Sequence, residues 1–165
     1  MEIRDATGQD AFAACEVLRR SISELCETDH RNDQKILDRW LANKTPEIVA
    51  SWIANPDTSV MVAAEAGNIL AVGSVTNEGE ITLNYVSPDA RFRGISRAML
   101  RSLEVRAVEC GNTSCHLVST ETARQFYRTA GYIETGPPQS KFGSSSYPMS
   151  KLLMGRQGRE RSSNI

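Results

Sequence analysis

Apolar residues in the first part of the chain lie at helical spacing. Between residues 12 and 25 they recur every three or four positions, which predicts an amphipathic helix of about five turns capped by Thr7. The polar residues 29–33 predict a turn-like connection, and shorter helices follow over 36–43 and 45–55, so three helices precede the first long strand. The inward positions of the first helix are predicted to be Phe12, Cys15, Leu18, Ile22 and Leu25.

The remainder of the chain changes between strand and helix patterns. Turns at Gly67-Asn68 and Glu78-Gly79 join three consecutive strands into an antiparallel meander. Residues 136–146 are rich in Gly, Pro and Ser and predict a connection without a strand. Strands are predicted at 2–4, 58–66, 69–77, 79–87, 114–119, 132–136 and 145–154, and helices at 95–111 and 120–131.

This order of elements predicts an α+β fold with a mixed α/β sheet and helices on its faces. No internal repeat or second domain boundary is visible, so residues 1–154 are expected to form one domain. Residues 155–165 have no apolar periodicity and are expected to form a polar tail that frays.

The balance of charges narrows the choice of partners. The 165 residues include 19 Lys and Arg against 20 Asp and Glu, a net charge of -1, which argues against a nucleic-acid binder. Arg supplies 15 of the 19 cations, a bias that weakly favours phosphate recognition. The four cysteines form no CxxC pair, and no cationic leader or long apolar stretch is present, so the chain is expected in the cytoplasm, with free thiols and no membrane contact.

The segment VSPDARFRGISRAML, residues 86–100, carries the candidate chemistry. A strand ends before Pro88, and Gly94 stands where a helix begins, so free N–H groups and a partial positive charge lie next to Arg91, Arg93 and Arg97. A phosphate or pyrophosphate suits this environment, although an ordinary turn with solvated arginines fits the same residues. Neither G-x-x-x-x-G-K-[ST] nor G-x-G-x-x-G occurs here.

The segment resembles the acetyl-CoA-binding loop of the GCN5-related N-acetyltransferases, the GNAT family. Arg91, Gly94 and Ser96 occupy the positions of the family's [Q/R]-x-x-G-x-[G/A] motif, with Ser96 where Gly or Ala is usual. The segment TETARQFYRTAGY, residues 120–132, resembles a second family motif, with Thr120 where Asn is common. The residues of this second segment that match are Ala123, Phe126, Tyr127, Gly131 and Tyr132.

The resemblance implies six to seven mostly antiparallel strands with a central pair that splays apart. Pantetheine would lie between strands 80–87 and 114–119, and a backbone N–H near Tyr85 or Val86 would hold the thioester oxygen. The cofactor-binding residues that the resemblance implies are Tyr85, Val86, Ser87, Arg91, Phe92, Arg93, Gly94, Ile95, Ser96, Arg97 and Thr120.

The resemblance also implies Tyr127 as the acid that protonates the departing thiolate, since a phenol keeps its proton at neutral pH. The base is open among Glu78, Glu80, Asn84 and His116, and a histidine between Cys115 and Leu117 is more often a core residue. The polar connection 29–33 either attracts a cationic amine or only caps the next helix. The candidate acceptor-binding residues are therefore Asp29, His30, Asp33, Asn84 and His116.

The predicted function is transfer of acetyl from acetyl-CoA to an amine by direct attack, with a small-molecule acceptor favoured and no metal involved. A CoA-binding regulatory module, a longer acyl donor, and acetylation of a protein N-terminus or lysine are alternatives. A homodimer is a family tendency, and no nucleic-acid partner is expected.

Overall fold

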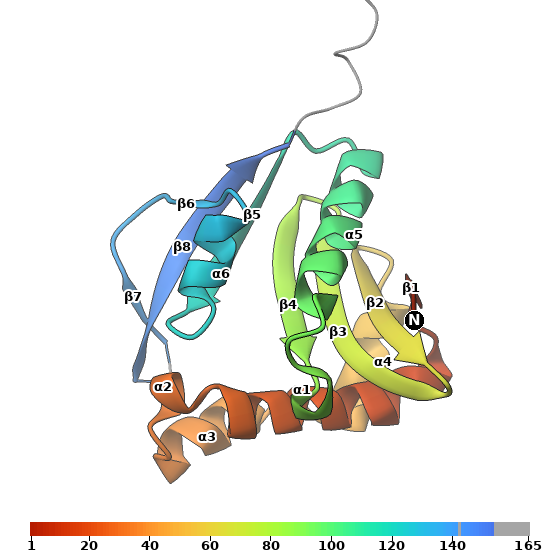
Figure 1. The fold of residues 1–165 in the computed structure, drawn as a ribbon, viewed down its shortest axis with the longest axis horizontal. Helices are drawn as coiled ribbons and strands as arrows, with labels where there is room; N and C mark the ends of the chain where they lie inside the picture. Colours follow the sequence, from red (N-terminus) through yellow and green to blue (C-terminus); the bar gives the residue numbers. More distant parts are fainter. Residues whose placement is uncertain (142, 154–165) are drawn as a thin grey trace, which may run out of the picture.

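The computed structural model describes residues 1–141 and 143–153, so the predicted tail lies outside the described residues. Its strands form one eight-stranded sheet in the order β1-β2-β3-β4-β5-β8-β6, with β7 paired to β8 (Figure 1). Of the pairings described, β4 with β5 is parallel and the others are antiparallel. The strands are β1 (Glu2–Asp5), β2 (Thr58–Glu65), β3 (Asn68–Thr76), β4 (Glu80–Val86), β5 (Ser114–Thr120), β6 (Ile133–Glu134), β7 (Gln139–Lys141) and β8 (Ser144–Leu152).

Helices cover both faces of the sheet, which confirms the predicted fold class. One core cluster joins α1 and α4 to strands β2 to β4, and a second joins α5 and α6 to the opposite face. In Figure 1, α1 runs across one end of the sheet, with α2 and α3 following it. The helices are α1 (Ala11–Leu25), α2 (Glu27–His30), α3 (Gln34–Leu41), α4 (Pro46–Ala54), α5 (Ile95–Glu109) and α6 (Arg124–Thr129), with short 3-10 turns η1 (Gly8–Asp10) and η2 (Pro88–Ala90).

The central strands β4 and β5 pair only at their beginnings. Glu80 lies opposite His116 and Ile81 opposite Leu117, and no later residue of β4 pairs with β5 in the described structure. Figure 1 shows the two strands diverging toward α1. The predicted splay is therefore present, and it opens a wedge in the middle of the sheet.

Three local predictions are wrong. Phe12 is 71% exposed, because the inward stripe of α1 runs through Ala11, Ala14 and Leu18 instead. The predicted connection 29–33 overlaps the last two residues of the single turn α2, Asp29 and His30, and both are buried. The Gly/Pro/Ser-rich segment contains β7, because β8 offers it a partner edge that composition does not reveal.

Gly79 sets the point where β4 and β5 meet. Its φ is +88°, and a Cβ built there would lie 2.7 Å from the backbone oxygen of Ser114, while its own carbonyl accepts from His116 N at 3.0 Å. Only glycine combines this conformation with so close an approach.

Gly79→Ala is expected to lower the free energy of unfolding by about 3 kcal/mol, from backbone strain plus overpacking. Gly67→Ala is the matched control, because Gly67 also has positive φ (+80°) but an added Cβ would meet nothing within 4 Å. Its cost is expected to be about 1 kcal/mol, from strain alone. Equal losses in urea unfolding of the two variants would contradict the close approach as the cause.

Candidate active site

A cavity of about 390 Å³ occupies the wedge. Its walls come from the end of α1, from β4 and β5, from the loop before α5 and from α6. The residues predicted for the site that line it are Asn84, Tyr85, Val86, Arg91, Phe92, Ser96, Thr120 and Tyr127. The splay of the sheet thus brings both sequence motifs to one cavity.

The loop before α5 presents backbone N–H groups at the end of this cavity. Gly94 is the N-cap of α5 in the left-handed conformation, with φ +75°, and the first helical bond described at this end runs from Ala98 N to the Gly94 oxygen. The preceding N–H groups of the first turn therefore have no helical acceptor. An added Cβ at Gly94 would meet nothing within 4 Å, so the space beside this N-cap is open.

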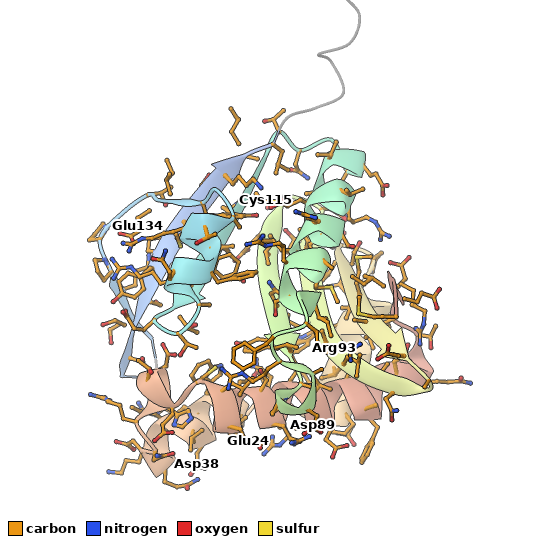
Figure 2. The ribbon with its side chains drawn as sticks, in the orientation of Figure 1. Glu24, Asp38, Asp89, Arg93, Cys115 and Glu134 are labelled. Atoms are coloured by element: carbon orange, nitrogen blue, oxygen red, sulfur yellow. The ribbon has the colours of Figure 1, made fainter. Side chains whose placement is uncertain are left out.

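The three arginines of the loop are not equivalent. Arg91 lines the cavity with its guanidinium 4.6 Å from the ring centre of Phe92, which is itself 93% exposed. Arg93 is paired with Glu65 on β2 at 2.9 Å, and Figure 2 shows it at the loop before α5. Arg97 is exposed and, like Ser87 and the buried Ile95, is not among the residues that line the cavity.

The backbone of β4 points a donor into the wedge. Ser87 N donates to the oxygen of Leu70 at 2.7 Å, so the peptide groups of Ser87 and Tyr85 face β3. Because successive residues of a strand direct their N–H and C=O groups to opposite sides, the N–H of Val86 points toward the side where β5 has diverged. Of the two predicted donors, the geometry therefore favours Val86.

Tyr127 reaches the cavity from α6, and its side chain is almost fully buried. Burial raises the pKa of Tyr127 to about 12, and the nearby amide of Asn84 counteracts part of that rise. The phenol is therefore protonated across the neutral range. Within the described residues, Oδ1 of Asn84 is buried and accepts no hydrogen bond, so it is free for a donor from a ligand.

A second cavity of about 90 Å³ adjoins the first and shares five lining residues with it, namely Thr82, Tyr85, Val118, Ser119 and Thr120. Trp40 and Asp29 also line this smaller cavity. It lies beside α2, α3 and the start of β8, on the side away from the loop before α5. The two cavities therefore share a wall formed by β4 and β5.

The other candidates for acceptor binding lie outside both cavities. His30 is fully buried, with Nδ1 accepting from Asn32 N at 3.0 Å and Nε2 at 3.2 Å from the Ser23 oxygen. Asp33 is exposed and caps α3 by accepting from Lys35 N at 2.9 Å. His116 is exposed on β5, so its interpretation as a core residue is wrong, because Cys115 and Leu117 occupy the buried face. Glu78 and Glu80 are exposed at the start of β4.

Few titratable groups face the two cavities. Burial raises the pKa of Cys26 to about 12 and also raises the pKa of Tyr85 above its usual value, so both side chains stay protonated at neutral pH. Arg91 is a cation, and both oxygens of Asp29 already accept hydrogen bonds. None of the described lining residues is therefore a free base.

The comparison with protein families decides the identity of the fold. The family model described as "Acetyltransferase (GNAT) domain" matches residues 27–153. The chain belongs to the GNAT acetyltransferase family. As a member of it, the chain is an acetyltransferase. No curated protein sequence matches the chain significantly.

Solved GNAT structures superpose on nearly the whole chain. A GCN5-related N-acetyltransferase from Rhodopseudomonas palustris has a TM-score of 0.80 at 22% identity, over 92% of this chain and 95% of the other. The PaiA N-acetyltransferase of Thermoplasma acidophilum, in complex with coenzyme A, has a TM-score of 0.74 at 19% identity, over 92% and 98%. A ribosomal-protein-alanine N-acetyltransferase from Brucella melitensis has 0.72 at 24%, over 93% and 100%.

Several lining residues of this GNAT site were not predicted from the sequence. The end of α1 contributes Ser21, Leu25 and Cys26, and β8 contributes Ser144 to Ser146 to the smaller cavity. In the sequence these residues are marked only by their position at the end of a predicted helix or strand, and that position does not reveal which other segments lie beside them. In the described residues no group of three His, Cys, Asp or Glu could hold a metal ion, and no helix is long and apolar enough to cross a bilayer.

Proposed function

We propose that the protein transfers the acetyl group of acetyl-CoA directly to the nitrogen of a small amine. The observation that carries this is the cavity in the wedge, which is lined both by Ser96 from the first turn of α5 and by the protonated phenol of Tyr127, and which shares a wall with the smaller cavity. Acetyl transfer needs a site for the anionic part of CoA, an acid near the thioester and a place beside the thioester for the amine.

The residues present fit coenzyme A. The first-turn N–H groups of α5 and the guanidinium of Arg91 suit a pyrophosphate, and the open space over Gly94 gives it room. Ser96 and Thr120 line the cavity, so the two departures from the family motifs lie within the site. The orphaned Oδ1 of Asn84 suits an N–H of the ligand. The bound thioester supplies the activated acetyl group.

The residues of the chain divide the chemistry between them. The N–H of Val86 stabilises the negative charge that develops on the carbonyl oxygen. The amine nitrogen forms a bond to the carbonyl carbon and the carbon–sulfur bond breaks. Tyr127 then gives its proton to the thiolate, and the phenolate left behind regains a proton from water because its pKa is about 12. Since no described lining residue is a free base, the proton lost by the amine passes to water.

The smaller cavity favours a narrow acceptor. About 90 Å³ between Trp40 and Tyr85 admits an amine and the first few carbons attached to it. Asp29 adds negative charge to this wall, which favours a cationic amine as it approaches. Structures similar to this chain include enzymes named aminoglycoside 6'-acetyltransferase as well as ribosomal-protein-alanine N-acetyltransferase, so acceptors in the fold span small molecules and proteins.

Release of CoA thiol with a panel of small primary amines, amino sugars and peptides with free N-termini tests the proposal. Acetylation of at least one small amine is expected. Its kcat/KM should rise with pH as the amine loses its proton, because the neutral amine is the nucleophile. When two amines differ in pKa, their pH profiles are expected to differ by the same number of pH units, because the enzyme supplies no base. If acetyl-CoA binds and no member of the panel is acetylated, the regulatory-module alternative replaces the proposal.

A further inference from the structure

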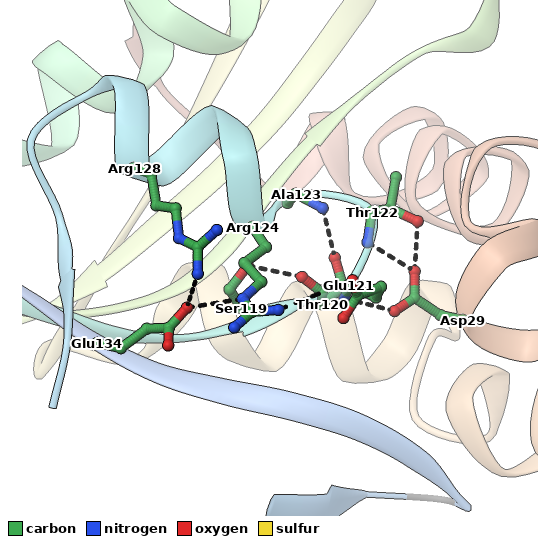
Figure 3. Close-up of polar contacts among 9 residues, drawn as sticks. All are labelled: Asp29, Ser119, Thr120, Glu121, Thr122, Ala123, Arg124, Arg128 and Glu134. Carbon is green, nitrogen blue, oxygen red and sulfur yellow. Dashed lines mark hydrogen bonds and ion pairs between the residues drawn. The ribbon is translucent and has the colours of Figure 1, made fainter. Parts of the chain in front are cut away.

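The carboxylate of Asp29 holds the turn between β5 and α6. Oδ1 accepts from Glu121 N at 2.6 Å, and Oδ2 accepts from Thr122 N at 3.2 Å and from the hydroxyl of Thr122 (Figure 3). Asp29 is only 3% exposed, so these bonds are shielded from water. Hydrogen bonds to a buried ionised group are among the strongest in proteins.

The turn that Asp29 holds leads directly into the helix of Tyr127. Thr120 Oγ1 accepts from Ala123 N at 3.1 Å, and Tyr127 N donates to the oxygen of Ala123 at 3.1 Å. The hydrogen-bonded chain from α2 to the backbone of Tyr127 is therefore short. A shift of the turn moves the phenol with it.

The apolar face of α6 packs in the core through Phe126 and Tyr127, whereas the ion pairs on its other side are exposed. Arg124 and Arg128 both bond to Glu134 on β6, at 2.6 and 2.7 Å, on the far side of the helix (Figure 3). Salt and water screen such surface ion pairs, and they constrain position weakly. The buried carboxylate of Asp29 is the firmer support of the start of α6.

We propose that Asp29 is a positioning residue that fixes the hydroxyl of Tyr127 for proton transfer. The inference rests on the proposed function, in which Tyr127 is the acid. Because Asp29 also lines the smaller cavity, the wall that receives the acceptor and the helix that carries the acid share one support. An acceptor seated against α2 thereby meets a phenol already in place.

Asp29→Asn tests this with little change of shape. The asparagine has one acceptor oxygen in place of two. Its NH₂ group would face the backbone N–H of Glu121 or Thr122, and because two donors cannot bond to each other, the turn loosens. We expect kcat to fall about 10- to 100-fold, the effect of a displacement of about 1 Å at a reacting group, while the Kd of CoA changes less than about 2-fold. Thr122→Val, which removes only the hydroxyl donor, is expected to give a smaller loss of the same kind.

A double-mutant cycle separates positioning from general damage. In the Tyr127→Phe background, Asp29→Asn is expected to lower kcat less than about 3-fold, because no acid remains to be misplaced. The same fold loss in both backgrounds overturns the inference. If Tyr127→Phe lowers kcat and Asp29→Asn does not, the inference fails and the proposed function stands. If Tyr127→Phe leaves kcat unchanged, the proposed acid and the inference fail together.

Asp10→Asn is the matched control for stability. The Asp10 carboxylate also accepts several donors, from Arg4 at 2.8 and 3.1 Å and from Thr7 N at 2.8 Å, but it lies in η1, away from the wedge. We expect both variants to melt at lower temperature and only Asp29→Asn to lose kcat. Hydrogen exchange at the amides of Glu121 and Thr122 is expected to speed up in Asp29→Asn and not in Asp10→Asn. Unchanged exchange at these amides overturns the inference.

Discussion

Tyr127→Phe is expected to lower kcat by about 100-fold, since a positioned general acid contributes about 10²- to 10⁴-fold. The substitution removes one hydroxyl and keeps the ring that packs edge-on against Phe126 and Tyr132, with ring centres 5.1 and 5.5 Å away. The Kd of CoA should therefore change little. Steady-state kinetics and a CoA titration on the same preparations measure the two effects.

Tyr132→Phe is the matched control. Tyr132 is equally buried, but its hydroxyl donates to Glu104 at 3.1 Å in a contact with Lys151 rather than lining the cavity. Its loss is expected to lower the free energy of unfolding by about 1 kcal/mol and to leave kcat unchanged. An equal loss of kcat in both variants would show that packing, and not the proton of Tyr127, is responsible.

The pKa of Tyr127 also sets the alkaline limit of activity. Its folded pKa of about 12 lies above the usual 10, so the acid form is favoured and is present at all pH values below about 12. The kcat of the native protein should therefore show no fall between pH 7 and 10 that belongs to this group. A fall centred near pH 10 that disappears in Tyr127→Phe would contradict the buried environment of the phenol.

Gly94→Ala is expected to weaken CoA binding by about 10-fold or more, because the added Cβ enters the open space beside the N-cap of α5, where we propose that the pyrophosphate binds. A factor of 10 corresponds to about 1.4 kcal/mol of binding free energy. The effect should fall on the Kd of CoA, with a smaller effect on kcat at saturation. Isothermal titration with CoA measures it directly.

Gly67→Ala controls for the backbone strain of Gly94→Ala. Both glycines have positive φ, +75° and +80°, and neither would bring a new Cβ within 4 Å of another atom. Both variants are therefore expected to lose about 1 kcal/mol of stability from strain alone. Only Gly94→Ala should lose affinity for CoA, and equal affinities would show that the pyrophosphate does not bind at this loop.

Helices, strands and turns that depend on residues close together in the sequence were predicted well. The helix that begins after Gly94 and the meander from 58 to 87 follow from periodicity and turn residues, and both are present. The two motifs around Gly94 and Tyr127 also predicted which family the chain belongs to. The turn of the first hairpin lies one residue earlier than predicted, at Ala66–Gly67, because both residues adopt positive φ.

The surroundings of individual side chains could not be predicted in the same way. Arg93 lies only two residues after Arg91, yet it pairs with Glu65, nearly thirty residues earlier in the sequence, and does not line the cavity. His116 is exposed because it alternates along β5 with Cys115 and Leu117, which occupy the buried face of the strand. Asp29 is buried because the turn before α6 comes to rest on α2.

The sequence by itself therefore determined most of the elements, the family and the loop that opens α5, since each depends on short segments of neighbouring residues. Tertiary structure alone decided where β4 and β5 part, which backbone N–H faces the gap, and that Asp29 supports the helix of Tyr127. These depend on the pairing of strands and on contacts between residues up to 93 positions apart, for which the local pattern carries no signal.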